Sequence, residues 1–331
     1  MVRRSIEVGA AWPLLDIASY ARRGPDDRVH LAQEEIQLLS RTVRRTPEVM
    51  VKVLTMGGRN LKAVGRHLTY LSHDGEVEIE TDDGQRLSGQ GREQELVEDW
   101  DLDLEEARRT TDLRSRPGAV RPKLVHKVVF SMPAGAPPEG LLRGAQAFAR
   151  ETFGAQHRYA MVLHTDEPHP HVHMVVKAVS EEGVRLNIRM ATLREWRREF
   201  ARHLRAQGIR ANATDKAVRG STRANLSDGM YRAMQRGASR RILVHMRSPG
   251  MEREAASEAS SRKSLMHTRA QVERGWLAAA EILDHQGQRD LAWYVRRFTD
   301  TLPPVRTDRE LLRRAALRPG ERGPPEQELT R

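Results

Sequence analysis

One segment, Arg158–Val179, constrains the fold more than any other part of the chain. Its sequence, RYAMVLHTDEPHPHVHMVVKAV, contains two apolar runs, Tyr159–Leu163 and Val172–Val179. Each run is short and is bounded by polar or proline-containing residues, which is typical of a β-strand. The segment therefore predicts two strands joined by a polar connection, and a protein that contains a β-sheet.

Between and within these strands lie four histidines and a carboxylate, His164, Asp166, His169, His171 and His173. Side chains alternate along a strand, so His171 and His173 project from one face while Val172 and Met174 point to the other. If the two strands are antiparallel neighbours, His164 at the end of the first strand meets the other two imidazoles. The pattern thus predicts three histidines that converge on one point.

Three neutral imidazoles would leave a bound divalent cation its full charge, which suits the polarisation of a phosphate oxygen. A structural zinc site is commonly closed by four protein ligands that include cysteine, and this chain has no cysteine. The plain alternative is that the histidines are solvated residues of a turn.

A second motif, VMVKVLTMGGRNLKAVGRHLTYLSHDGEV, covers Val49–Val77. It predicts a strand at Val49–Leu54, a stop at Gly57-Gly58 and a helix at Arg59–His73. Tyr70 falls beside the apolar stripe of this helix, where a tyrosine can pack its ring and still present its hydroxyl. An ordinary tyrosine at the edge of a buried face is the alternative.

Both motifs resemble those of a known family. HTDEPHPHVHMVV is similar to the third motif of the plasmid relaxases, which belong to the HUH endonucleases, and Val49–Val77 resembles the first motif of the MOB-P relaxases. The T-DNA border endonucleases belong to the same group. The resemblance covers about residues 48 to 214, and the motifs stand in the expected order.

The resemblance implies a DNA relaxase that nicks one strand at an origin of transfer for conjugation. Tyr70 would be the nucleophile and would form a 5′-phosphotyrosine adduct. A divalent ion, Mg²⁺ or Mn²⁺, would bind His164, His171 and His173. Asp166 would act as the base or orient a metal-binding histidine, with His169 as the alternative base.

Two other functions stay open. A rolling-circle replication initiator uses the same chemistry, although its tyrosine usually follows the histidine motif, whereas Tyr70 precedes it here. A non-catalytic single-stranded nucleic-acid-binding module is the other alternative, and a nicking assay with and without EDTA separates it from both enzymes.

The resemblance implies an α+β fold with a central antiparallel five-stranded sheet flanked by helices. Residues 1–46 would form a helical extension, 47–214 the nuclease domain and 215–331 a basic, mostly helical region. The other elements expected are strands at Glu76–Glu80, Lys123–Met132 and Val184–Ile188, helices at Glu139–Phe153 and Leu193–Gln207, and helical stretches at Asp228–Ser239 and Ser264–Phe298, broken at Gly287. Residues 85–120 are polar and charged, with an acidic block from Glu93 to Glu106, and predict a surface helix and a loop away from the substrate.

A formal net charge of +11 and a pI near 10.4 favour a polyanionic partner, here single-stranded DNA. Lys52, Lys127, Lys177 and the arginines after Leu193 are candidates for phosphate contacts, and His126 is a candidate for DNA contact or indirect support of the metal. From Thr214 on, 23 Lys and Arg stand against 15 Asp and Glu, so that region could grip DNA, bind accessory relaxosome proteins or carry a signal for the coupling protein of a type IV secretion system.

The apolar part of the N-terminus is interrupted by Glu7, Pro13 and Asp16, which argues against a signal peptide. Since no apolar run is long enough to cross a bilayer, we expect a cytoplasmic protein without membrane insertion, with export alongside DNA as an open alternative. Apolar residues at spacings of three and four from Val29 to Val43 predict a helix that packs on the main domain or binds a partner.

Overall fold

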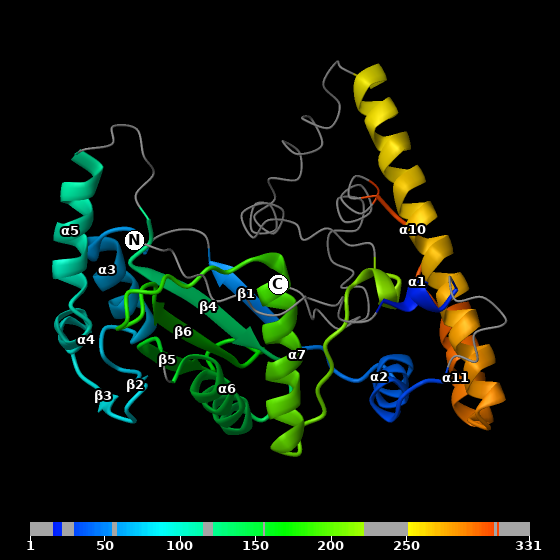
Figure 1. Cartoon of the computed structure of the whole chain (residues 1–331), viewed down its shortest axis with the longest axis horizontal. Helices are drawn as coiled ribbons and strands as arrows, with labels where there is room; N and C mark the ends of the chain where they lie inside the picture. The colour runs from blue at the N-terminus through cyan, green and yellow to red at the C-terminus, as the bar shows by residue number, and fades with distance from the viewer. Residues whose placement is uncertain are drawn as a thin grey trace. The chain divides into compact units, whose positions relative to one another are not determined.

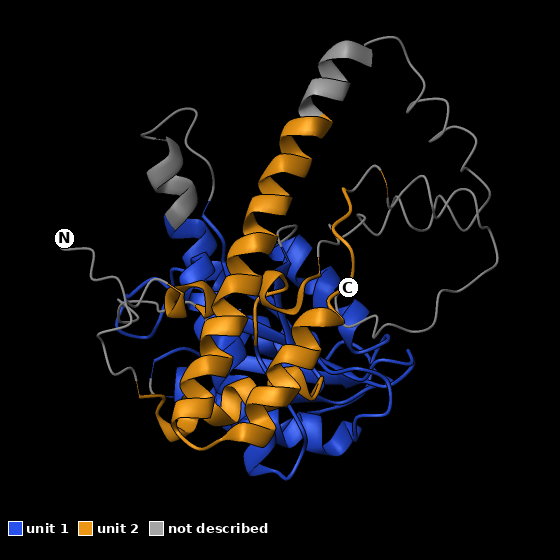
Figure 2. Ribbon diagram, turned by 90° about the vertical axis from the view of Figure 1, so that its right-hand side faces the viewer, with its two compact units in different colours: residues 1–11, 47–213 blue, residues 12–46, 214–331 orange. Residues whose placement is uncertain are grey.

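The computed structural model describes residues 16–21, 30–54, 58–114, 122–154, 156–221, 251–307 and 310. The chain divides into two compact units, unit 1 with residues 1–11 and 47–213 and unit 2 with residues 12–46 and 214–331 (Figure 2). The helix predicted at Asp228–Ser239 and the proline-rich tail lie outside the described residues. The division into three domains at residues 46 and 214 stays a prediction.

Unit 1 contains one antiparallel sheet of six strands in the order β1-β4-β6-β5-β2-β3 (Figure 1). The strands are β1 Met50–Leu54, β2 Ile79–Thr81, β3 Arg86–Leu87, β4 Val125–Ser131, β5 Tyr159–His164 and β6 His171–Lys177. The α+β class and the antiparallel sheet agree with the prediction, but the predicted number of five strands was wrong. The short strand β3, which follows the tight turn after β2, adds a sixth strand at the edge.

The strand predicted at Val184–Ile188 was also wrong. This segment forms only an isolated bridge between Val179 and Arg185, although Leu186 donates its backbone N–H to the carbonyl of Ala178. The turn at Gly183, where φ is +79°, returns the chain so soon after β6 that only a few backbone hydrogen bonds form. The segment therefore does not form a strand of the sheet.

Helices cover both faces of the sheet. The helices of unit 1 are α3 Leu61–Leu71, α4 Glu93–Asp99, α5 Leu102–Arg114, α6 Pro138–Phe153 and α7 Met190–Ala206. Phe148 of α6 and Phe200 of α7 pack on Phe130 of β4, with ring centroids 5.0 Å away in both cases. Buried side chains of α3 and α4 form a second core with Val162 and Val175, on the opposite face. The central strands are thus held rigid from both sides.

The acidic segment differs from the predicted surface helix. It forms two helices, α4 and α5, whose junction buries Leu96, Val97, Trp100 and Leu102 in the second core. The side chain of Glu93 accepts a hydrogen bond of 2.6 Å from the hydroxyl of Thr69 on α3. The apolar residues are too few and too irregularly spaced among the carboxylates for the sequence to have disclosed this packing.

A tight turn follows α3 and depends on Gly75. The φ angle of Gly75 is +93°, and a Cβ atom there would lie 2.3 Å from the carbonyl carbon of Gly89. We expect Gly75→Ala to lower the free energy of unfolding by about 2 kcal/mol or more, since a backbone clash adds to the strain of a left-handed alanine. Thermal unfolding measures this effect as a lower melting temperature.

Gly84 supplies a matched control for that variant. Its φ of +85° is nearly the same, but no atom lies within 4 Å of a Cβ built there. Gly84→Ala should therefore show only the conformational cost of about 1 kcal/mol. If both variants lower the free energy of unfolding equally, the close approach of Gly75 and Gly89 adds nothing to the cost of the Gly75→Ala change.

Unit 2 is helical in its described residues. Its elements are α1 Ile17–Tyr20, α2 Gln33–Val43, the 3-10 helix η1 Ala217–Arg219, α10 Met251–His285 and α11 Arg289–Asp300. Trp276 of α10 lies at the centre of the core and donates its indole N–H to the carbonyl of Val218, at 2.9 Å. The predicted break at Gly287 is confirmed. The predicted N-terminal helix is α2, but the prediction that it packs on the main domain was wrong, because its buried side belongs to the core of unit 2.

No helix within the described ranges is both long enough and apolar enough to cross a membrane.

Candidate active site

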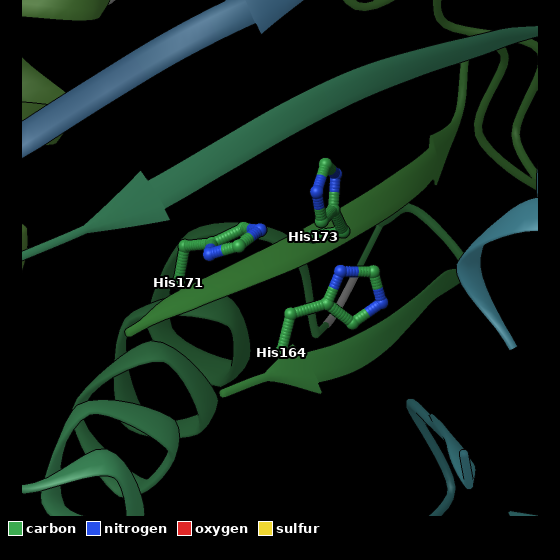
Figure 3. A group of neighbouring side chains, drawn as sticks. All are labelled: His164, His171 and His173. Atoms are coloured by element: carbon green, nitrogen blue, oxygen red, sulfur yellow. The ribbon is translucent and has the colours of Figure 1, made fainter. Parts of the chain in front are cut away.

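The two central strands bring the three predicted histidines together (Figure 3). In the antiparallel register, His164 at the end of β5 stands opposite His171 at the start of β6, and Val162 stands opposite His173. All three imidazoles project from the same face, whereas Val172 between them is fully buried on the other face. The predicted convergence of these side chains is confirmed.

The three rings are close enough to share one ion. Their centroids lie 5.2 Å apart for His164 and His171, 4.9 Å for His164 and His173, and 5.0 Å for His171 and His173. One ring nitrogen of each lies within 4.8 Å of the others. Nitrogens bound to one ion at about 2.1 Å are about 3 to 3.5 Å apart, so small rotations of the rings would suffice.

Hydrogen bonds to backbone carbonyls orient two of the rings. The Nε2 atom of His164 lies 2.7 Å from the carbonyl oxygen of Leu71, and the Nδ1 atom of His171 lies 3.0 Å from that of His169. Each of these nitrogens must carry the proton, because a carbonyl only accepts. Nδ1 of His164 and Nε2 of His171 are then unprotonated and free to bind a cation.

Burial favours the neutral form of two of these imidazoles, those of His164 and His173. Burial, together with the neighbouring imidazoles of His164 and His171, lowers the pKa of His173 to about 3. Burial also lowers the pKa of His164. A neutral imidazole is the form that binds a metal. The donor set therefore fits a divalent cation.

The end of helix α3 lies at this histidine cluster. Val64, Leu68 and Leu71 form the buried side of the helix, while the side chain of Tyr70 is 68% exposed. The next residue along, Leu71, offers the carbonyl that His164 contacts. Tyr70 is thus an exposed tyrosine on a helix whose end is bound directly to the cluster.

Asp166 lies at the side of the cluster. It is exposed in the connection between β5 and β6, and a carboxylate oxygen lies within 4.8 Å of ring nitrogens of His73 and His164. The imidazole of His169 is engaged elsewhere, because its Nδ1 atom accepts a hydrogen bond of 3.0 Å from the backbone N–H of Ala134. Of the two predicted bases, only Asp166 has its side chain placed beside these histidines.

Comparison with known proteins identifies this part of the chain. Residues 72–209 match the family model described as "Relaxase: MobA/VirD2-like, nuclease domain". The matched range is less than half of the chain and is similar to a relaxase nuclease domain. The matched range contains the histidine cluster and begins two residues after Tyr70.

Two curated proteins that are similar to this chain are T-DNA border endonucleases. VirD2 of Agrobacterium fabrum is 26% identical over 219 residues, which are 59% of this chain and 46% of that protein. VirD2 of Rhizobium radiobacter is 23% identical over 211 residues, 59% of this chain and 48% of that protein. The chain thus spans about half the length of the curated relatives it matches.

A solved structure described as "Molecular Basis of Vancomycin Resistance Transfer in Staphylococcus aureus" covers 51% of this chain and 99% of that chain, with 13% identity and a TM-score of 0.30. A TM-score this low supports no statement about fold or function.

The structure adds two histidines that sequence reasoning missed. His73 follows α3 with a φ of +47°, and its ring centroid lies 4.7 Å from that of His164. His67 stands one helical turn before Tyr70, with ring centroids 6.4 Å from both Tyr70 and His173. Spacings of three residues on either side of Tyr70 are the signal that could have found them.

His67 is the more unusual of the two. Its Nε2 atom is buried and has no hydrogen-bond partner among the described residues. Burial and the nearby charge of Lys127 lower its pKa to about 4. A neutral imidazole whose Nε2 has no hydrogen-bond partner among the described residues therefore lies near both Tyr70 and His173.

The predicted phosphate contacts differ in their surroundings. Lys52 and Lys127 lie on the same face of the sheet as His173, since Val129 stands opposite both Lys52 and His173 and Lys127 stands opposite Val175. Lys52 is exposed, whereas burial lowers the pKa of Lys127. Lys177 forms an ion pair of 2.9 Å with Glu181.

His126 is separated from the histidine cluster. It alternates with Lys127 along β4 and so projects from the opposite face of the sheet. Burial lowers its pKa to about 4, and its Nδ1 atom has no partner among the described residues. A direct contact with a metal on the cluster is therefore excluded by the register.

Proposed function

We propose that this protein nicks one strand of DNA at an origin of transfer by metal-dependent transesterification. The observation that carries the proposal is the contact between Leu71 and His164, which joins the end of the Tyr70 helix to the three-histidine cluster. The matched relaxase family and the T-DNA border endonucleases support a DNA substrate.

In the proposed reaction, the Tyr70 hydroxyl oxygen attacks the phosphorus atom of one phosphodiester. A bond forms between tyrosine and phosphorus, the bond from phosphorus to the 3′ oxygen breaks, and a 5′-phosphotyrosine and a free 3′-hydroxyl result. Because the new bond is also a phosphodiester, the 3′-hydroxyl can reverse the step and rejoin the strand without a nucleotide cofactor.

A residue near Tyr70 would accept the proton that its hydroxyl loses during attack. A phenol has a pKa near 10, so a nearby base favours attack at neutral pH. Asp166 is the proposed base, or it orients His164, because it lies beside that imidazole. His169 remains the alternative base if its contact with Ala134 opens in the substrate complex.

His164, His171 and His173 would hold the divalent cation. Such an ion supplies positive charge against the negative charge that develops on the scissile phosphate. Of the two ions predicted from the sequence, Mn²⁺ suits a three-nitrogen donor set better than Mg²⁺, which prefers oxygen ligands and retains its waters. Nicking rates with Mn²⁺ and Mg²⁺ at equal concentration test this preference.

The DNA backbone would cross the sheet face that carries Lys52, Lys127 and the histidine cluster. These two lysines form no ion pair among the described residues, whereas several arginines of α7 do: Arg197 with Glu48, Arg198 with Glu195, and Arg202 with Glu151 and Glu199. Helix α7 also packs on the opposite face of the sheet. We therefore favour Lys52, whose side chain is exposed, as a phosphate contact, whereas Lys127 is buried.

Salt should weaken this binding steeply. For single-stranded DNA, the logarithm of affinity should fall with the logarithm of salt with a slope of about −0.7 per phosphate contact. We expect Lys52→Met to reduce the magnitude of the slope by about that amount in fluorescence anisotropy titrations. Lys177→Met is the control, because Glu181 already neutralises that ammonium group; an equal change in both variants would contradict the assignment.

A nicking assay tests the proposed function directly. The full chain is incubated with Mn²⁺ and single-stranded oligonucleotides that carry candidate origin-of-transfer sequences, with and without EDTA. Denaturing gels should show a nicked product and a protein–DNA adduct that EDTA suppresses. Binding without cleavage on every sequence would instead favour a non-catalytic nucleic-acid-binding module.

Accessory relaxosome proteins and a secretion coupling protein are the further partners that we propose. Residues outside the relaxase domain are the candidates for these contacts. Pull-down with the purified accessory proteins of a conjugative system, using the full chain, would test for them.

A further inference from the structure

Helix α11 in unit 2 exposes two aromatic rings that its packing does not require. Leu291, Ala292, Val295 and Phe298 form its buried side, and Phe298 packs on Trp276 with ring centroids 5.1 Å apart. Trp293 and Tyr294 lie off this side and are 51% and 42% exposed. Their rings contact each other edge to face, with centroids 5.0 Å apart.

Arginines surround the exposed pair. The guanidinium of Arg297 lies 5.2 Å from the centroid of the Trp293 ring, and that of Arg44 lies 5.3 Å from the centroid of the Tyr294 ring. Arg44 follows helix α2, which contacts α11 (Figure 1). Two elements far apart in sequence thus build one surface, the α2–α11 patch, which consists of Arg44, Arg45, Trp293, Tyr294 and Arg297.

Arg45 completes the patch. Its backbone has a φ of +52°, a conformation that usually favours glycine or asparagine. The guanidinium lies 5.9 Å from the centroid of the Phe298 ring, and Nη2 is 3.4 Å from the hydroxyl oxygen of Thr301. These contacts hold a positive charge at the edge of α11 despite the backbone cost.

The charges of the patch are not neutralised. Among the described residues, none of the guanidinium groups of Arg44, Arg45 and Arg297 forms an ion pair with a carboxylate. By contrast, Arg296 on the same helix pairs with Asp284. Because a guanidinium that stacks on a ring keeps its N–H bonds in its own plane, these donors stay available to a phosphate.

We propose that the α2–α11 patch binds single-stranded DNA, with bases stacked on Trp293 and Tyr294 and phosphates bound by Arg44, Arg45 and Arg297. Exposed aromatic rings interleaved with arginines are the chemistry that binds unpaired bases and their backbone together. A duplex offers no free base faces to the rings. An apolar protein surface would leave three guanidinium charges without partners.

This inference goes beyond the proposed nuclease function, since it assigns unit 2 a separate binding site for a DNA strand. Two linked binding sites on one strand raise the overall affinity, because the second binding event takes place at the high effective concentration that the chain connection sets. A nicked strand bound in this way would be retained while its end is processed.

Cross-linking tests the patch without requiring cleavage. The full chain is irradiated with an oligothymidine in which one base is 5-iodouracil, then digested with trypsin and analysed by mass spectrometry. Residues 290–296, DLAWYVR, form one tryptic peptide that carries both aromatic residues. We expect cross-links on this peptide that unlabelled single strands suppress and duplex does not.

Binding measurements add a quantitative arm. In the double variant Trp293→Ala, Arg44→Ala, oligothymidine should bind about ten-fold more weakly or worse, because a stacked base and a phosphate contact are both lost. The matched control is Leu277→Ala, Arg274→Ala, which removes an exposed apolar side chain and an exposed arginine from α10.

One outcome overturns this inference, and another separates it from the proposed nuclease function. Affinity equal to that of the control variant, with no cross-link on the peptide 290–296, would show that the patch does not bind single-stranded DNA. A cross-link in a protein that never nicks would instead support the patch and count against the proposed relaxase function, so the two failures are distinguishable.

Discussion

Tyr70→Phe should abolish the covalent protein–DNA adduct and lower the nicking rate by at least about a thousand-fold, because the variant lacks the nucleophilic oxygen. The change removes one hydroxyl from a side chain that is 68% exposed, so the free energy of unfolding should shift by no more than about 0.5 kcal/mol. The measurement is a denaturing gel after incubation with a cognate single strand and Mn²⁺.

Tyr159→Phe is the control for that experiment. Tyr159 is buried at the far end of β5, five residues from His164, and about 3.3 Å per residue places it roughly 16 Å from His164. Its variant should form the adduct normally. An adduct at the wild-type level in Tyr70→Phe would show that another tyrosine is the nucleophile.

The double variant His171→Ala, His173→Ala should lose all metal-dependent cleavage, since only one of the three imidazoles then remains. Single-stranded DNA should still bind within about two-fold of the wild type, because neutral imidazoles add little to phosphate binding. A readout independent of activity is thermal unfolding: Mn²⁺ at about 100 times its Kd should stabilise the wild type by about 2.7 kcal/mol and leave the variant unchanged.

The control for this variant is His267→Ala, His285→Ala, which removes two exposed histidines from α10. It should keep both the cleavage and the stabilisation by Mn²⁺. If the His171→Ala, His173→Ala protein nicks at the wild-type rate, the metal site lies elsewhere in the chain.

Much of the site could be predicted because its residues are close in sequence. His164, His171 and His173 lie within ten residues, and strand alternation alone places two of them on one face. The strands β1, β4, β5 and β6 could also be predicted, because each contains a run of apolar residues longer than is usual in a loop. The local sequence pattern was sufficient to predict the geometry wherever that geometry depends on one pair of neighbouring strands.

Prediction failed where distant segments meet. The contact between Leu71 and His164 uses a backbone carbonyl, which has no sequence signature, and it joins residues 93 positions apart. The junction of α4 and α5 buries Trp100 within an acidic segment, and the α2–α11 patch joins residues more than 240 positions apart. None of these contacts follows from the periodicity of one element.

The register of β5 and β6 has a consequence for how this protein can vary. Because His164 pairs directly with His171, the hydrogen-bonded ladder fixes their separation, and the six residues between them do not. Insertions in that connection would change its length and leave the imidazoles together. A single inserted residue inside either strand would turn a histidine to the opposite face. The loop is free to diverge, and the two strands that it joins are not.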